Sequence, residues 1–389
     1  MYAKARGLTT GRAPGENGRR STREGTGEFY AMKYRLMNAL HKVRTAGWGV
    51  WVVALLLYVS LALLLQPDAE ELIEEEMEDL QEWVAKNEAM MREAHKERSR
   101  TAHDVCEKYD VYMGQDDYVR KLTQQGEKLQ YSDWFTLKRV NWNNMYYAPH
   151  EDFVYCKVPK SGSSTWVYNL LKLANVPEDQ ISSDVGLHQL LRDYYPKMSS
   201  SQMKKTLKKS FKFTVVRHPF ERILSAFRDK LENYERDVMF RDGYYNTMYG
   251  KYIVKVYRDD SDLTLANRTE PTWQEFVKYL INTPSSKFDD HWRPVYALCS
   301  PCVIKYNVIA KMETFSEDTQ FIINQLGLED RLHVEWIHRT SDTRTSDIAT
   351  AYFSQLTLRQ IDQLFEKYRL DFELFGYDYE AYRQMALEE

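Results

Sequence analysis

A short loop of small residues between two regular segments constrains the fold of this chain more than any other feature. Residues 153–158 are rich in β-branched and aromatic side chains and are followed by Pro159, which predicts a buried strand. Further on, apolar residues recur at helical spacing, namely Trp166, Val167, Leu170 and Leu171. Residues 160–165 therefore connect a strand to the amino end of a helix.

Such a loop favours an anion. Unpaired backbone amides and the helix dipole at a helix amino end attract phosphate or sulfate, and Lys160 adds a positive charge. The candidate anion ligands are Lys160, Ser161, Gly162, Ser163, Ser164, Thr165 and Trp166. In a Walker A loop the lysine follows the glycines, whereas here it precedes Gly162, so an ordinary nucleotide triphosphatase is disfavoured. A plain strand, turn and helix with a surface lysine is the alternative.

A second strand and helix follow the same plan. Residues 211–216 read as a strand, and Pro219 suits the first turn of the helix after it. Arg217 then lies at the carboxyl end of the strand, where open α/β sheets bind ligands, and can hold a phosphate bidentately, with Ser225 adding a hydroxyl. The fold expected is α/β, a P-loop-like, mainly parallel central sheet flanked by helices.

Four segments, at residues 159–166, 217–228, 290–302 and 371–377, carry a resemblance to a known family. The first reads Pro-Lys-Ser-Gly-Ser-Ser-Thr-Trp, and the third contains His-Trp-Arg-Pro followed by Leu-Cys-Ser-Pro-Cys. In combination they resemble the PAPS-dependent sulfotransferases, and among them the Golgi carbohydrate sulfotransferases that include the chondroitin and dermatan 4-O-sulfotransferases. The resemblance implies that the first loop binds the 5′-phosphosulfate of PAPS and the second binds its 3′-phosphate.

The function that this resemblance implies is transfer of a sulfuryl group from PAPS to a glycan hydroxyl, at O4 of N-acetylgalactosamine in a chondroitin or dermatan chain. Sulfation of glucuronic acid or of an N-glycan terminus is an alternative, as is an inactive membrane-tethered glycan-binding scaffold. Lys160 is expected to stabilise charge on the leaving group. The general base is expected to be His291 or, alternatively, His188, although a packed scaffold histidine is an equal reading of His291. This chemistry requires no metal.

The amino-terminal part predicts a membrane anchor. Residues 46–65 contain no charge and are long enough to span a bilayer. Basic residues precede this segment and an acidic run follows it, so the positive-inside rule places residues 1–45 in the cytosol as a disordered tail. The expectation is a type II signal-anchor in the Golgi membrane with a luminal catalytic domain. A cleaved signal peptide is the rival interpretation.

Residues 66–130 are expected to form a luminal stem, and residues 131–389 the single catalytic domain. The stem contains a heptad-like seam formed by Ile73, Met77, Leu80, Val84, Asn87, Met91 and Ala94. This seam predicts a short coiled coil and a homodimer, with a single solvated helix as the alternative. Nucleic acid is not an expected partner, because the net charge is −4.

Four cysteines lie in the part predicted to be luminal, namely Cys106, Cys156, Cys299 and Cys302. An oxidising compartment favours disulfides, and the sequence leaves their pairing open. Cys299 and Cys302 form one CxxC motif, which without a second ligand pair is weak for zinc. Asn267 begins a glycosylation sequon, which makes the chain a candidate glycoprotein.

Overall fold

The computed structural model describes residues 69–112, 131–181, 186–235, 237, 243–259, 261, 265, 268–333 and 345–387. Within these residues, no helix is both long enough and apolar enough to cross a membrane. The predicted tail, the predicted span at residues 46–65 and Asn267 of the sequon lie outside the described residues.

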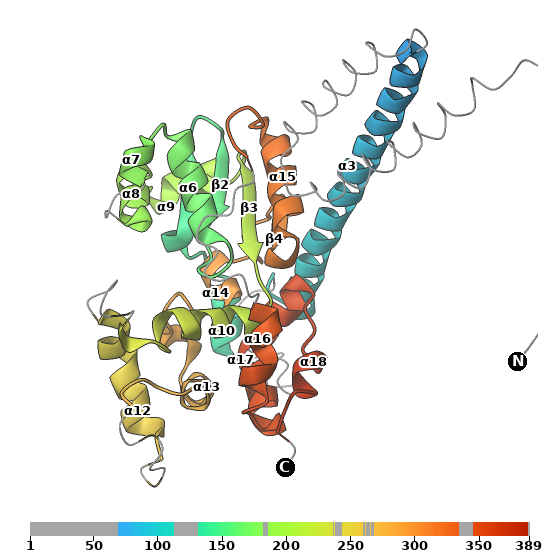
Figure 1. Ribbon diagram of the computed structural model, residues 1–389. Coiled ribbons are helices and arrows are strands. Elements are labelled where there is room, and N and C mark those ends of the chain that lie inside the picture. Colours follow the sequence, from blue (N-terminus) through green and yellow to red (C-terminus); the bar gives the residue numbers. More distant parts are fainter. Residues whose placement is uncertain are drawn as a thin grey trace, which may run out of the picture. The chain divides into compact units, whose positions relative to one another are not determined.

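A four-stranded sheet forms the centre of the described domain, in the order β1-β2-β3-β4 (Figure 1). The strands are β1 Met145–Ala148, β2 Phe153–Cys156, β3 Phe211–Val216 and β4 Val308–Lys311. Strands β2, β3 and β4 run parallel, and the edge strand β1 is antiparallel to β2. The expectation of a mainly parallel sheet is confirmed, with the antiparallel edge making the sheet mixed.

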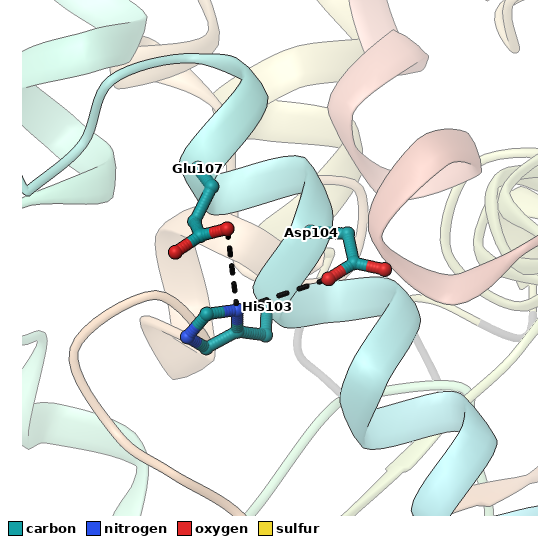
Figure 2. Close-up of side chains that lie close together, drawn as sticks. All are labelled: His103, Asp104 and Glu107. Atoms are coloured by element: carbon teal, nitrogen blue, oxygen red, sulfur yellow. Dashed lines mark ion pairs between the residues drawn. The ribbon is translucent and has the colours of Figure 1, made fainter.

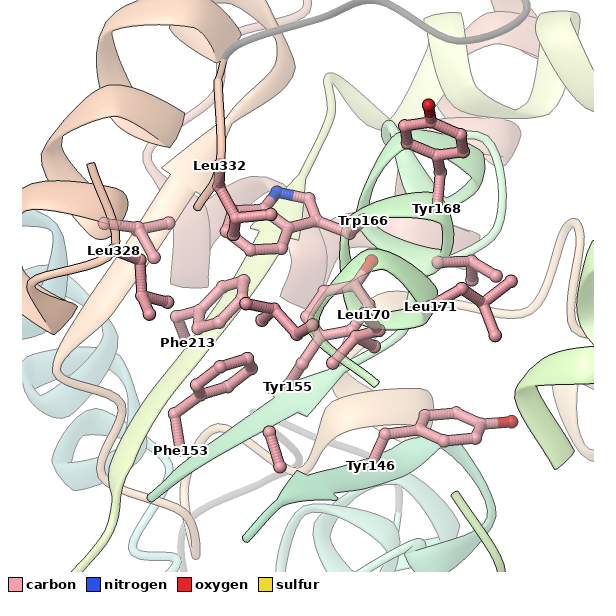
Figure 3. Packing of buried hydrophobic residues seen from close by; sticks show 14 of the residues in the cluster. Tyr146, Phe153, Tyr155, Trp166, Tyr168, Leu170, Leu171, Phe213, Leu328 and Leu332 are labelled. Carbon is pink, nitrogen blue, oxygen red and sulfur yellow. The ribbon is translucent and has the colours of Figure 1, made fainter. Parts of the chain in front are cut away.

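Each parallel strand leads into a helix: α6 Ser163–Leu173 follows β2, α10 Pro219–Lys230 follows β3, and α15 Phe315–Leu326 follows β4. Side chains alternate between two cores, with Phe213 and Val215 in one and Val216 in the other. Burial on both faces is typical of parallel sheets. The rings of Trp166 and Phe213 lie 4.4 Å apart, and Figure 3 shows them among the aromatic residues between α6 and the strands.

The remaining helices surround this centre. They are α5 Tyr131–Leu137, α7 Glu178–Ile181, α8 Leu187–Tyr194, α9 Ser200–Thr206, α12 Lys251–Tyr257, α13 Trp273–Asn282, α14 Val295–Cys299, α16 Thr345–Phe353, α17 Leu358–Phe375 and α18 Glu380–Arg383. Short helical turns occur at Trp142–Asn144, Asn246–Gly250, Ser285–Lys287 and Met312–Thr314. A third, aromatic core joins α10, α13 and α17. Thr357 and Gln360 form a capping box that starts α17.

Helix α3, Ala69–Lys108, runs from the predicted stem onto the sheet domain, where it packs against β4 and α17. Ala102 and Cys106 are buried in a domain core, and Met91 of the predicted heptad seam packs against another. Arg98 Nη1 contacts Asp318 Oδ2 of α15 at 2.7 Å. The carboxyl half of α3 thus contributes to the folded domain. Dimerisation through the stem stays a prediction.

Two disulfides confirm the expected use of the cysteines. Cys106 pairs with Cys302, and Cys156 pairs with Cys299, with Cα atoms 5.6 and 5.9 Å apart. The two cysteines of the CxxC motif therefore bind different partners. One bond ties α3 to the segment after α14, and the other ties the end of β2 to α14.

Candidate functional site

The two predicted loops meet at one edge of the sheet. Because β2 and β3 are parallel neighbours, the loops at their carboxyl ends lie side by side. The guanidinium of Arg217 donates through Nη1 to the carbonyl oxygen of Lys160 at 3.3 Å. The structure thus brings together the residues that the sequence assigns to one anion site.

The first loop owes its shape to two residues with positive φ. Lys160 has φ +68° and Gly162 has φ +66°. A Cβ atom on Gly162 would lie 2.3 Å from Cε2 of Phe315, so both conformation and space require glycine. A non-glycine residue such as Lys160 in this region costs on the order of 1 kcal/mol, which is typical of functional loops.

The amino end of α6 has no side-chain cap. Helix α6 starts after Gly162, and no side chain caps it. Its first amides have no acceptor within the helix and converge on the loop. Ser163 and Thr165 are buried and Ser164 is half-buried. The hydroxyl of Ser161 is buried and has no hydrogen-bond partner among the described residues. Such an orphaned hydroxyl fits a ligand phosphate or sulfate.

Trp166 takes a different place from the other loop residues. Its ring is fully buried, and its indole nitrogen has no hydrogen-bond partner in the described part of the chain. The ring packs on Tyr155 and Phe213. This placement makes Trp166 a scaffold residue that anchors α6 to the sheet.

Two neighbours hold the guanidinium of Arg217 in position. In addition to the carbonyl of Lys160, its Nη2 contacts Glu221 Oε2 at 3.2 Å, and both side chains are largely buried. Ser225 lies one turn beyond Glu221 on α10 and is half-buried. Arg217 therefore lies at the end of β3, and Ser225 lies on α10, the helix that follows, as the sequence predicts.

Lys160 is one of two lysines that share a carboxylate. Its Nζ lies 3.2 Å from Asp229 Oδ2, and Nζ of Lys230 lies 3.0 Å from the same oxygen. Burial lowers the pKa of Lys160 to about 8; Asp229 opposes this shift, whereas the charges of Lys230 and Arg217 add to it. Two cations and one anion leave a net positive charge beside the loop.

His291 forms a dyad with Asp289. His291 Nδ1 lies 2.6 Å from Asp289 Oδ1 and 3.1 Å from the hydroxyl of Tyr245. Burial lowers the pKa of His291 to about 4; Asp289 opposes this shift, and Lys230 and Lys160 strengthen it. At neutral pH the imidazole is therefore uncharged. The contact with the carboxylate assigns the proton to Nδ1, which leaves Nε2 as a proton acceptor.

His188, the alternative base, belongs to the same region. It lies on α8 and is exposed to solvent. Desolvation by the surrounding protein, together with the charges of Lys157, His291 and Lys230, lowers the pKa of His188 to about 3. Both candidate bases thus lie within electrostatic reach of the lysines beside the loop, and both are neutral at pH 7.

The sequence interpretation missed several residues of this site. Asp229, Lys230 and Tyr245 connect Lys160 to His291, since the ammonium of Lys230 also lies 4.9 Å from the ring centre of Tyr245. The only sequence signal was the position of Asp229 and Lys230 at the end of the helix that Arg217 precedes. Nothing in the sequence indicated that Tyr245 meets His291.

Arg222 is a further missed residue, which joins the loop to the histidine segment. It is fully buried, and its Nη1 donates to the carbonyl of His291 at 3.0 Å and to that of Pro159 at 3.5 Å. Its Nη2 also donates to the carbonyl of Arg293. A buried arginine with carbonyl partners on both segments fixes their spacing. Its place on the buried face of α10 was the available signal.

Side chains of the types that bind metal ions lie close together elsewhere, on α3. Figure 2 shows exposed His103 with Asp104 and Glu107, and the three ligand atoms lie within 4.8 Å of one another. Adjacent side chains of one exposed helix commonly lie this close without an ion. They give no reason to assign a metal, and metal-free chemistry stays a prediction.

Comparison of the chain with known proteins gives a family match. A family model described as "Sulfotransferase family" matches residues 143–378. The chain is 28% identical over 250 residues to rat carbohydrate sulfotransferase 11, covering 60% of this chain and 67% of the relative. Zebrafish carbohydrate sulfotransferase 14 is 31% identical over 233 residues, covering 58% and 59%. Carbohydrate sulfotransferase 10 of Xenopus laevis is 28% identical over 296 residues, covering 73% and 76%. No solved structure matches the chain.

Proposed function

Because this chain belongs to the sulfotransferase family, we propose that it transfers a sulfuryl group from PAPS to a hydroxyl of a glycan. The observation that carries the proposal is the contact of Arg217 with the carbonyl of Lys160 at the uncapped amino end of α6. The names of the relatives, all carbohydrate sulfotransferases, support a glycan acceptor.

The donor fits the residues present. The amides at the start of α6 and the orphaned Ser161 hydroxyl provide donors for the 5′-phosphosulfate. Arg217 and Ser225 are assigned to the 3′-phosphate. When bound, PAPS supplies the sulfuryl group on a phosphate leaving group. Lys160 stabilises the negative charge that grows on that phosphate as the bond to sulfur breaks.

The acceptor hydroxyl needs a base. We assign this role to His291, whose Nε2 takes the hydroxyl proton as the new sulfur–oxygen bond forms. The resulting imidazolium is stabilised by Asp289, which holds Nδ1 at 2.6 Å. His188 is the alternative base, since its imidazole is also neutral at pH 7 and is open to solvent.

The finer acceptor assignment is O4 of N-acetylgalactosamine in a chondroitin or dermatan chain. Its support is the motif resemblance and the relationship to carbohydrate sulfotransferases 11 and 14. Glucuronic acid or an N-glycan terminus is the alternative acceptor.

The proposed location is the Golgi membrane, with a type II anchor at residues 46–65 and the site in the lumen. Protease added to intact vesicles should then spare the sulfotransferase domain.

The direct test is an assay of the full-length protein with radiolabelled PAPS against a panel of desulfated glycans. Label in one glycan, and its position in that glycan, would identify the acceptor. Binding of the product nucleotide is measured in parallel by calorimetry. Nucleotide binding without transfer to any glycan would support the scaffold alternative, and absence of nucleotide binding would refute the proposed donor site.

A further inference from the structure

Three cations gather next to the site without a carboxylate partner. Lys157 follows β2, Arg192 lies on α8, and Lys197 precedes α9. No described residue forms an ion pair with any of them, and the ammonium of Lys157 has no hydrogen bond to a described residue. Lys160, Arg217 and Arg293, in contrast, each contact a carboxylate.

The two lysines share one aromatic ring. The ammonium of Lys197 lies 4.2 Å from the ring centre of Tyr146, and that of Lys157 lies 5.9 Å from it. Tyr146 is buried and belongs to β1, so it provides a rigid platform. Lys197 also donates to the carbonyl of Asn143, which holds its side chain in place.

Like charges lie close together in this cluster. Burial, together with the charges of Lys197 and Arg192, lowers the pKa of Lys157 to about 8. The carboxylate that opposes this shift is Asp290, which Arg293 contacts at 3.2 Å and Asn144 at 3.4 Å. The cluster thus keeps an excess of positive charge, and an anion bound there would relieve the repulsion.

The cluster adjoins the reaction centre through His188. Besides desolvation by the surrounding protein, the charges of Lys157 and Arg192 from the cluster and of His291 and Lys230 from the reaction centre lower the pKa of His188. An anion held by the cluster would therefore lie within electrostatic reach of the reaction centre.

We propose that Lys157, Arg192 and Lys197 form a subsite for an anionic group of the acceptor glycan, next to the hydroxyl that receives the sulfuryl group. This proposal rests on the proposed function and narrows it to acidic acceptors. The anion is a carboxylate of a uronic acid or a sulfate ester on a neighbouring sugar. A neutral N-glycan terminus would leave the three cations unpaired.

The test uses full-length protein and three forms of one polymer: unsulfated chondroitin, its carboxyl-reduced neutral form, and that neutral form after chemical sulfation. Lys197→Gln and Arg192→Gln are the main variants, because both side chains are exposed. Lys205→Gln, an exposed lysine on α9, is the matched control. Lys157→Gln is added once its thermal unfolding matches that of the parent.

For Lys197→Gln and Arg192→Gln, we expect KM for the charged polymer to rise about tenfold, because a hydrogen bond to a charged group is lost. The kcat, the affinity for product nucleotide and the KM for the neutral polymer should stay within about twofold, as should every value for the control. A rise in KM for unsulfated chondroitin would identify the bound anion as a carboxylate. A rise in KM for the sulfated neutral form would identify it as a sulfate.

Equal losses for neutral and charged polymers, or no change for any charged polymer, would overturn the subsite while leaving sulfuryl transfer intact. Calorimetric binding of the polymers to protein loaded with product nucleotide gives a second readout. It tests the subsite even if no transfer occurs, because Lys197→Gln should then weaken binding of the charged polymer alone. Failure to bind the nucleotide would instead refute the proposed function.

Discussion

Replacing Lys160 is expected to affect the rate of sulfuryl transfer more than the binding of the donor. Its charge is assigned to the leaving phosphate in the transition state, so Lys160→Ala should lower kcat by about a hundredfold or more, each tenfold loss corresponding to about 1.4 kcal/mol. Initial rates at saturating PAPS measure this effect, and Lys205→Ala on α9 is the control. Unchanged turnover in a folded Lys160→Ala protein would remove Lys160 from this role.

Arg217 is predicted to act on affinity. It is assigned to a phosphate remote from the reacting sulfur, so Arg217→Ala should weaken binding of the product nucleotide by about tenfold to a hundredfold. Calorimetry with that nucleotide is the measurement. Glu221, which contacts Arg217 at 3.2 Å, would lose its partner, so the thermal unfolding of the variant must be compared with that of the parent. Nucleotide affinity equal to that of the parent would contradict the assignment.

The titration of the site predicts a bell-shaped pH profile. Below the pKa of His291, about 4, the base is protonated and cannot accept a proton. Above the pKa of Lys160, about 8, the ammonium loses its charge. Asp229 raises the pKa of Lys160, so Asp229→Asn should move the alkaline limb of kcat/KM for PAPS to lower pH. An unmoved alkaline limb would show that another group titrates there.

At the scale of the elements, the strand-to-helix loop depends on one glycine. Gly162→Ala forces a side chain into positive φ and against the ring of Phe315, and is expected to lower the unfolding free energy by about 2–3 kcal/mol. Two controls separate the causes. Gly327 has φ +63° with nothing within 4 Å, and Gly186 has open space around it and a φ of −57°.

Gly327→Ala should then cost about 1 kcal/mol, from the strained backbone alone, and Gly186→Ala should cost close to nothing. Chemical denaturation of the three variants measures these values. Equal stability of Gly162→Ala and Gly186→Ala would show that neither the backbone conformation nor the Phe315 contact constrains the loop.

At the scale of the whole molecule, one disulfide links α3 to a segment far along the chain. Cys106 and Cys302 are separated by 196 residues, so loop closure predicts that replacing both by serine lowers the unfolding free energy by about 5 kcal/mol. Denaturant unfolding of the double variant measures this loss. An unaltered stability would mean that the packing of α3 on β4 and α17 holds the helix without the bond.

Local features of the site could be read from the sequence. The strand at residues 211–216, the helix that starts at Pro219 and the turn before α6 follow from side-chain period and from the conformations of proline and glycine. Two strands of this kind, each leading into a helix, also predict parallel pairing. Lys160 and Arg217 could therefore be placed at one sheet edge without the structure.

Other features depend on where distant segments pack. The pairing of four cysteines has three solutions, and only the docking of α3 beside the segment after α14 selects Cys106 with Cys302. The contact of Tyr245 with His291 and the positions of Lys157 and Lys197 on Tyr146 likewise join separate segments. The sequence by itself determined the two strand-to-helix loops, because backbone period and turn geometry are local. Only the tertiary structure decided the partners of His291 and the gathering of Lys157 and Lys197 on Tyr146, because those contacts form between segments whose spacing along the chain carries no signal.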